Sequence, residues 1–273
     1  MSGVLTMRQI EEFEEKKQDI VMEAKYPRIH DPNIISLAEE LTTILRVNFN
    51  EIFKAETFNI LSKIAFLPCK IPSMRSNIVR EDNVIPISLC RPMDALLEKD
   101  YVLSWTVAPV VTVKMPEMGL QHLCITSPPP IDVVIAHCLN LSKVRGGLDG
   151  WMYRDDPVEV FDKIISFLNV QFRSDKVTKP HITTLSNTPF IPIGSSLLKP
   201  SRLFMSMDGG DLSPFMFTVP RQFQSYEKLF KVLGTKEKPS ISDYHQFLLE
   251  LAAECGSNKP LNINELNAVC DCW

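Results

Sequence analysis

The sequence lacks the features that mark a membrane, secreted or nucleic-acid-binding protein. None of its apolar runs approaches the ~20 residues that a membrane-spanning helix needs. The stretch from Met1 to Arg8 has no charged lead, apolar core or cleavage site of a secretory signal. The net charge is -4, with Lys and Arg scattered among the acidic residues, so no basic patch for nucleic acid is present. We therefore expect a soluble, cytoplasmic protein that binds neither membrane nor nucleic acid.

Glycine is scarce, and cysteine follows no ligand spacing. The chain has ten glycines, and Gly146-Gly147 is not followed by the Lys-Ser/Thr of a phosphate-binding loop. The seven cysteines are odd in number and mostly isolated in apolar surroundings, which is typical of reduced thiols in the cytosol. Cys270 and Cys272 form a close pair, but Cys255 and His245 complete no metal-binding pattern with them. We predict no metal site and no cofactor.

No catalytic constellation is apparent. Gly194-Ser195-Ser196 lacks the second glycine of an esterase elbow and indicates a loop that leaves a strand. Asp155-Asp156 is explained by a helix cap. Trp105 and Trp151 are expected to be core or hinge aromatics, with a pocket role as the alternative. We predict no catalytic residue and no enzymatic activity, although an enzyme of an unrecognised type, with a pocket of converging polar groups, remains an alternative.

The histidines do not suggest a site either. His137 lies on an apolar helix, where a satisfied core group is a simpler explanation than a base. All five are far apart in the sequence: His30, His122, His137, His181 and His245.

The hydrophobic pattern predicts both helices and strands. Asp31-Pro32 is expected to cap a helix whose face with Ile34, Leu37, Ala38, Leu41 and Leu45 is buried. The other predicted helices span residues 6–25, 51–63, 132–144, 156–172, 222–233, 240–255 and a last segment from 262. The predicted strands span 64–69, 84–89, 102–113, 188–193, 202–207 and 215–219. Since proline cannot donate a ladder hydrogen bond, Pro68, Pro86 and Pro109 are expected at edges, bulges or strand ends.

One phrase occurs twice in the chain. Ile64-Ala65-Phe66-Leu67-Pro68-Cys69 is followed by Leu89-Cys90-Arg91-Pro92, and Thr188-Pro189-Phe190-Ile191-Pro192-Ile193 is followed by Leu197-Leu198-Lys199-Pro200. Each copy is an apolar strand with a proline, a loop and an L-x-[RK]-P phrase, with amphipathic helices before and after it. A duplicated helix–strand–helix unit without a catalytic motif indicates a modular interaction protein.

The predicted fold is α+β, with two related helix–strand–helix repeat units whose small mixed sheets are flanked by helices. We expect a helical lead-in over 1–63, a first α/β unit over 64–150 and a second over 151–273. Since the last helix has barely begun at Trp273, we expect this second unit to be truncated and the chain to be a fragment. The predicted core is Leu41, Phe58, Phe66, Trp105, Val134, Phe161, Ile165, Leu168, Phe190, Phe204, Phe217, Leu229 and Phe247.

Several phrases in order resemble the repeat regions of the sacsin family, in particular those of its plant relatives. They are Phe190-Ile191-Pro192-Ile193, Leu198-Lys199-Pro200-Ser201-Arg202-Leu203-Phe204, Asp211-Leu212-Ser213-Pro214-Phe215 and the tail from Leu229 to Gly234 and from Leu261 to Val269. The likeness covers about residues 52–270 and is strongest after about 188. Ala65-Phe66-Leu67-Pro68 and the segment from Leu103 to Val110 match more loosely.

The resemblance implies a giant modular cytosolic protein linked to chaperone work. Its implied partners are DnaK-type heat-shock chaperones or unfolded clients. The GHKL-type nucleotide-binding domain that begins each family repeat has no counterpart here, since neither its Glu-x-x-x-Asn helix nor its Asp-x-Gly-x-Gly loop is present. We therefore expect a non-catalytic module with a chaperone- or co-chaperone-associated protein-binding role. The alternative is a structural spacer, a remnant of a larger ATP-driven chaperone-like protein without independent activity.

Overall fold

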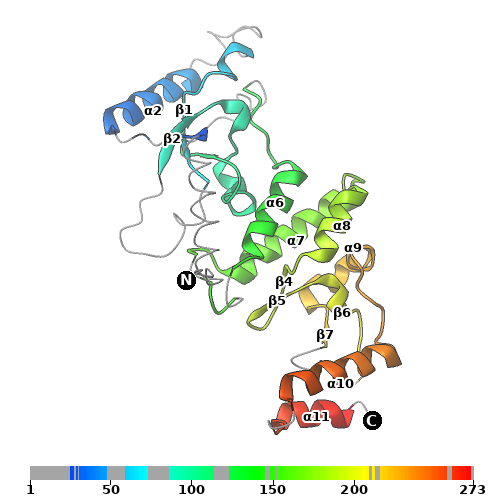
Figure 1. Cartoon of the computed structure of the whole chain (residues 1–273). Coiled ribbons are helices and arrows are strands. Elements are labelled where there is room, and N and C mark those ends of the chain that lie inside the picture. Colours follow the sequence, from blue (N-terminus) through cyan, green and yellow to red (C-terminus); the bar gives the residue numbers. More distant parts are fainter. Residues whose placement is uncertain are drawn as a thin grey trace, which may run out of the picture. The chain divides into compact units, whose positions relative to one another are not determined.

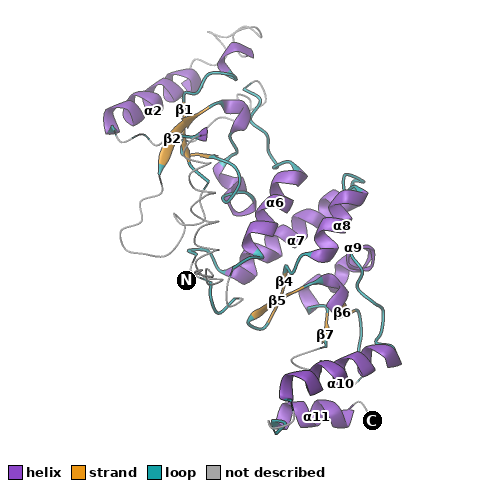
Figure 2. Cartoon of the chain, viewed as in Figure 1, coloured by secondary structure: helices purple, strands orange, loops and turns teal. Residues whose placement is uncertain are grey.

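The chain folds as two compact units of helices and small sheets. The computed structural model describes residues 25–27, 29, 31–47, 59–72, 86–113, 123–144, 148–151, 153–208, 211–212, 216–256 and 260–271 (Figure 1). By their contacts, residues 1–140 and 152–164 form unit 1, and residues 141–151 and 165–273 form unit 2. The predicted α+β class is confirmed, with helices and short strands mixed in both units (Figure 2).

Helix α2 (Pro32–Val47) is the first long helix in the described part of unit 1. The Asp31 carboxylate accepts the Asn33 N–H at 2.9 Å, so the predicted cap is confirmed. The side chains of Ala38 and Leu45 are buried, and the helix packs against β1. Ile34, Leu37 and Leu41 of the same predicted face are 43–67% exposed, so the expectation of burial is confirmed for Ala38 and Leu45 and wrong for these three. Only the edge of the apolar face that carries Ala38 and Leu45 lies against the sheet. The spacing of the apolar residues along the sequence does not indicate which edge of the face is buried.

The sheet of unit 1 has three antiparallel strands in the order β2–β1–β3. They are β1 (Leu67–Lys70), β2 (Ile87–Cys90) and β3 (Val110–Val111). Pro86 and Pro109 precede strands as expected, but Pro68 lies in the central strand, where no proline was expected. It is tolerated because β3 ends opposite Cys69, while the Pro68 carbonyl accepts the N–H of Thr112 at 3.0 Å.

The predicted strand over 102–113 is mostly wrong. The 3-10 helix η1 (Pro92–Asp94) precedes this segment, and the end of a second one, η2 (Glu98–Leu103), followed by a turn, replaces all of the predicted strand except β3. The Ser104 hydroxyl donates to the Asp100 carbonyl at 3.0 Å, and the Ala108 N–H donates to Ser104 O at 3.0 Å. These local bonds satisfy the backbone inside the segment, so its run of apolar residues forms a buried turn. Helix α6 (Ile131–Leu141) follows, close to the predicted bounds.

Helix α7 (Pro157–Arg173) begins at the predicted Asp156 cap, whose carboxylate accepts the N–H groups of Val158 and Glu159. Its apolar residues Phe161, Ile165 and Leu168 are fully buried. Helix α8 (Lys179–Asn187) was not predicted. The helix begins with a capping box, in which the His181 side chain accepts the Thr178 N–H at 3.2 Å.

Unit 2 holds two separate pairs of strands. Strands β4 (Ile191–Ile193) and β5 (Ser196–Leu198) form an antiparallel hairpin, and β6 (Leu203–Phe204) and β7 (Phe217–Thr218) run parallel. Between the pairs lies η3 (Pro200–Arg202). Helices η4 (Arg221–Tyr226) and α9 (Glu227–Val232) follow β7, and Gly234 has the positive φ of a helix end at 100°.

The last helices are α10 (Ile241–Cys255) and α11 (Ile263–Asp271). Ser240 and Asp243 form a capping box at the start of α10, as the sequence indicates. Phe247 and Leu251 of α10 pack with Phe204 and with Ala268 of α11 in one apolar cluster.

The predicted core is largely confirmed. Leu41 is exposed and Phe217 is half-buried, so these two assignments are wrong, and Phe58 lies outside the described residues. Phe217 belongs to a two-residue strand with sheet pairing on one side, which leaves its ring partly open. The buried members are Phe66, Trp105, Val134, Phe161, Ile165, Leu168, Phe190, Phe204, Leu229 and Phe247. The predicted helix over 6–25 and most of that over 51–63 also lie outside the described residues.

The two copies of the phrase adopt the same local structure. In one hairpin Leu67 pairs with Cys90, and in the other Ile191 pairs with Leu198. Each hairpin is followed by a basic residue and then by a 3-10 helix that begins with proline, η1 or η3. Each residue pair of the β4–β5 hairpin has a counterpart at the same position in the pairing of β1 with β2.

Candidate functional site

A hollow in unit 2 lies beside the β4–β5 hairpin. It is an open groove of about 630 Å³. Pro192, Ile193 and Gly194 form one wall, and Thr218, Val219 and Pro220 contribute to the lining from the other strand pair. Gly194 turns the hairpin with a φ of 56°, a conformation that suits glycine.

The β7 side of the groove is fixed by a carboxylate. The Asp211 side chain accepts the Thr218 N–H at 2.6 Å and the Thr218 hydroxyl at 2.9 Å. Val219 donates its N–H to the carbonyl of Phe204 at 2.9 Å. The backbone of β7 is therefore engaged with Asp211 and β6 and keeps its place at the wall.

Two methionines extend the lining beyond β6. The Met205 N–H donates to Lys236 O at 2.8 Å, and the Ser206 N–H donates to Glu237 O at 3.0 Å. Met205 and Met207 are half-buried, so their thioethers contribute an adaptable apolar surface. Such a surface suits contact with varied side chains.

The charged groups of the groove do not form an acid–base pair. Asp211 is engaged by Thr218, and Arg221 lies in η4 with an exposed side chain. The remaining described lining consists of backbone, apolar, hydroxyl and amide groups. This arrangement is chemically suited to holding a chain by contacts and backbone hydrogen bonds.

A smaller hollow is lined by Arg202 and Glu250. The Arg202 guanidinium donates to both oxygens of Glu250, at 2.9 and 2.6 Å, which joins η3 to α10. The hydrogen bond from Arg202 lowers the pKa of Glu250 to about 2. The Arg202–Glu250 ion pair therefore has a structural role.

His137 is a satisfied core group, as expected. It is fully buried, with Nδ1 at 2.7 Å from the Thr106 hydroxyl and Nε2 at 3.0 Å from Val102 O. Burial lowers its pKa to about 3, so the ring is neutral at physiological pH. The ring meets Trp105 edge-on at 5.2 Å between centroids. Since it is sealed from solvent, this imidazole has no access to a substrate.

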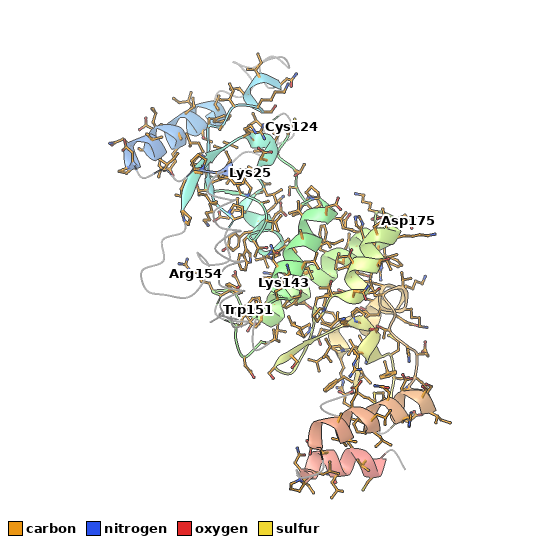
Figure 3. All side chains as sticks on the ribbon, in the orientation of Figure 1. Lys25, Cys124, Lys143, Trp151, Arg154 and Asp175 are labelled. Atoms are coloured by element: carbon orange, nitrogen blue, oxygen red, sulfur yellow. The ribbon has the colours of Figure 1, made fainter. Side chains whose placement is uncertain are left out.

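Trp105 itself is a core aromatic, one of the two predicted roles. It is buried and packs against Tyr101 and Tyr153. Its Nε1 and the Asp100 Oδ2 are buried without a hydrogen-bond partner in the described part of the chain. Burial raises the pKa of Asp100, against a hydrogen bond with Ser127. Trp151, labelled in Figure 3, is half-buried in a turn at Leu148–Trp151.

The remaining candidates from the sequence do not come together. Ser195 lies in the β4–β5 turn, where its carbonyl accepts the Leu148 N–H at 2.7 Å. An esterase elbow joins a strand to a helix, whereas this turn joins two strands. Asp156 caps α7, and Gly146-Gly147 lies outside the described residues.

The cysteines are mixed in exposure. Cys69 and Cys90 are buried on paired strands, and a hydrogen bond between them together with burial raises the pKa of Cys69. Cys124 (Figure 3) and Cys270 are exposed, and Cys272 lies outside the described residues. Within the described ranges, no three His, Cys, Asp or Glu side chains are placed to hold a metal ion. Nor does any helix described there have the length and apolar character to cross a membrane.

The sequence did not point to the groove. Its wall residues Pro192 and Pro220 are far apart in the chain, and Pro192 stands out in the sequence only as part of the repeated phrase. The sequence signal that could have indicated the groove is the difference between the two copies of the repeated phrase and the segments that follow them. Residues that pair strands in the first copy are replaced in the second copy.

Similarity to a known protein covers part of the chain. Over 156 residues, 56% of this chain, the sequence is 27% identical to sacsin from Homo sapiens. The chain spans only 3% of the length of sacsin in this match. No protein-family model matches the chain, and no solved structure matches it. Over just more than half of its length, the chain is similar to sacsin.

Proposed function

We propose that the chain is a non-catalytic protein-binding module of sacsin-like, repeat-built organisation with a chaperone- or co-chaperone-associated role in the cytoplasm. One observation carries the proposal. The groove beside β4 combines proline and methionine side chains with hydroxyl, amide and Arg221 side chains, and its Asp211 carboxylate is already engaged by Thr218. A surface of this kind is suited to binding polypeptide by shape and hydrogen bonds.

The proposed partners are unfolded clients or DnaK-type heat-shock chaperones. The likeness to sacsin supports this role, since the resemblance implies a protein linked to chaperone work. The second candidate is a structural spacer within a larger protein. The match covers 3% of the length of sacsin, and this small share favours the spacer as the second candidate.

The test is suppression of aggregation. The full chain is mixed with a thermally unfolding client, and light scattering is followed without nucleotide and with ATP. We expect suppression that does not depend on ATP. Absence of suppression by a folded, monodisperse sample favours the spacer, and suppression that requires ATP contradicts a module without a nucleotide site.

A matched pair of variants links suppression to the groove. Gln224 lines the groove and Gln222 does not, although both are exposed residues of η4. Gln224→Trp is expected to fill the groove and weaken suppression, while Gln222→Trp leaves it unchanged. Equal suppression by both variants places client binding elsewhere on the chain.

A further inference from the structure

We infer that the groove is an open strand slot, in which an extended apolar peptide segment pairs with the edge of β4. The inference rests on the proposed protein-binding function and names its site and the form of the bound segment. Unit 1 contains the corresponding hairpin, and there the same strand edge is covered by a further strand.

In unit 1 the edge of β1 is closed by β3. Cys69 pairs with Val111 and Lys70 with Val110. At the end of this pairing, the carbonyl of Pro68 accepts both the N–H of Thr112, at 3.0 Å, and its hydroxyl, at 2.9 Å. A short extended apolar segment thus completes the sheet.

The hairpin registers identify the matching residues on the first wall of the slot. Leu67 pairs with Cys90 just before Arg91, and Ile191 pairs with Leu198 just before Lys199. Pro68 of β1 therefore corresponds to Pro192 of β4, since each is the next residue along its strand. The two positions that follow, Ile193 and Gly194, correspond to Cys69 and Lys70, the residues that pair with β3.

The second wall is matched by a shared backbone bond. The Val111 N–H donates to Leu96 O at 2.9 Å, and the Val219 N–H donates to Phe204 O at 2.9 Å. Leu96 and Phe204 are each the fourth residue after the proline that begins η1 or η3. Val219 therefore corresponds to Val111.

The neighbours of Val219 follow directly. Thr218 takes the place of Val110, and Pro220 takes the place of Thr112. Gly194, Thr218, Val219 and Pro220 all line the groove, so the groove lies where β1 and β3 pair in unit 1.

Two substitutions and one competing hydrogen bond in unit 2 remove the bonds that close the sheet in unit 1. Pro220 has neither the N–H nor the hydroxyl that Thr112 donates. The N–H of Thr218 is taken by the Asp211 carboxylate. Gly194, at a φ of 56°, turns the chain at the position where Lys70 continues its strand. In the described part of the chain, β4 accordingly pairs with β5 and β7 with β6.

The chemistry of the slot defines its occupant. Because the Pro68 carbonyl faces β3, the corresponding carbonyl of Pro192 faces the slot, where it can accept a hydrogen bond from an N–H donor. The surrounding Ile193, Met207 and Val219 are apolar. A backbone N–H can supply the donor and β-branched side chains the apolar contact, as Val110-Val111-Thr112 do in unit 1. The occupant is an extended segment of this character, added as a strand.

The probe is a labelled peptide with the sequence of residues 108–113, Ala-Pro-Val-Val-Thr-Val, titrated with the full chain by fluorescence anisotropy. We expect binding that weakens about tenfold when the threonine amide is N-methylated, the effect of one lost hydrogen bond. Gln224→Trp is expected to abolish binding, and Gln222→Trp to leave it unchanged. Far-UV circular dichroism checks that both variants fold, and the N-methylated peptide tests the slot without any variant.

The outcomes separate the slot from the proposed function. Aggregation suppression without peptide binding overturns the slot and leaves the proposed function standing. Peptide binding that survives both N-methylation and Gln224→Trp also overturns the slot, because it places the peptide elsewhere on the chain. Absence of both suppression and peptide binding overturns the slot and the proposed function together.

Discussion

Replacement of Phe190 by alanine tests whether the start of β4 is part of the core. Its side chain is 1% exposed, and its backbone N–H donates to Leu198 O at 3.1 Å, which anchors the ring beside the hairpin. Loss of a fully buried phenylalanine costs about 1.5–3 kcal/mol in transfer free energy alone. The cavity left behind raises the expected loss in the free energy of unfolding to about 3–5 kcal/mol.

The assay is urea denaturation followed by circular dichroism and fluorescence. Phe66→Ala is the companion variant, because Phe66 is buried at the matching position before β1. Ile241→Ala is the control, since that side chain is 89% exposed and its loss is expected to stay within about 0.5 kcal/mol. A loss below about 1 kcal/mol for Phe190→Ala refutes the assignment of this strand to the core.

Three further predictions concern charge and exposure. The pKa of Glu250, lowered to about 2 by Arg202, means that their ion pair stabilises the fold above pH 4.5 and is lost as the pH falls towards 2. Unfolding midpoints across this window should show a contribution of up to about 1 kcal/mol that Glu250→Gln removes; an unchanged pH profile in that variant contradicts the pairing. Burial lowers the pKa of His137 to about 3, so the unfolded chain takes up this proton first and stability falls as pH drops below 6.5. In NMR spectra its ring signals should not titrate between about pH 7 and 4 in the folded state, and a midpoint near 6.5 refutes the burial. Finally, Leu37→Lys on the exposed stripe of α2 should change stability by less than about 0.5 kcal/mol, whereas Leu45→Lys on the buried face should be severely destabilising; thermal melts that rank them oppositely reverse the two faces.

Local signals in the sequence were enough to locate much of the fold. Asp31, Asp156 and Ser240 are good caps whose side chains bond backbone N–H groups within a few residues, so their helices begin where predicted. The missed helix α8 also carried such a signal, in Thr178 and His181. The apolar phrases around Phe66 and Phe190 marked the core of each hairpin, because residues of this size are rarely left in water.

Patterns that depend on distant partners were less informative. The segment over 102–113 has a strand-like composition, but bonds from Ser104 to Asp100 hold it in turns. The predicted apolar face of α2 has the periodicity of a buried face, yet only Ala38 and Leu45 of that face are buried, while Leu37 and Leu41 are exposed. Periodicity reports that a helix has an apolar side, whereas burial requires a second element to lie against it.

The class of the fold, the helix starts, the twice-used hairpin and most of the buried aromatic residues follow from neighbours along the chain, so the amino-acid sequence is enough to predict them. The candidate site was decided only by the tertiary structure. Pro192 and Pro220 acquire meaning when β4 and β7 lie on opposite sides of one groove, at the place where Pro68 and Thr112 are bonded in unit 1. Strand pairing joins residues far apart in sequence, so whether an edge is closed or open depends on which donors the folded chain brings to it.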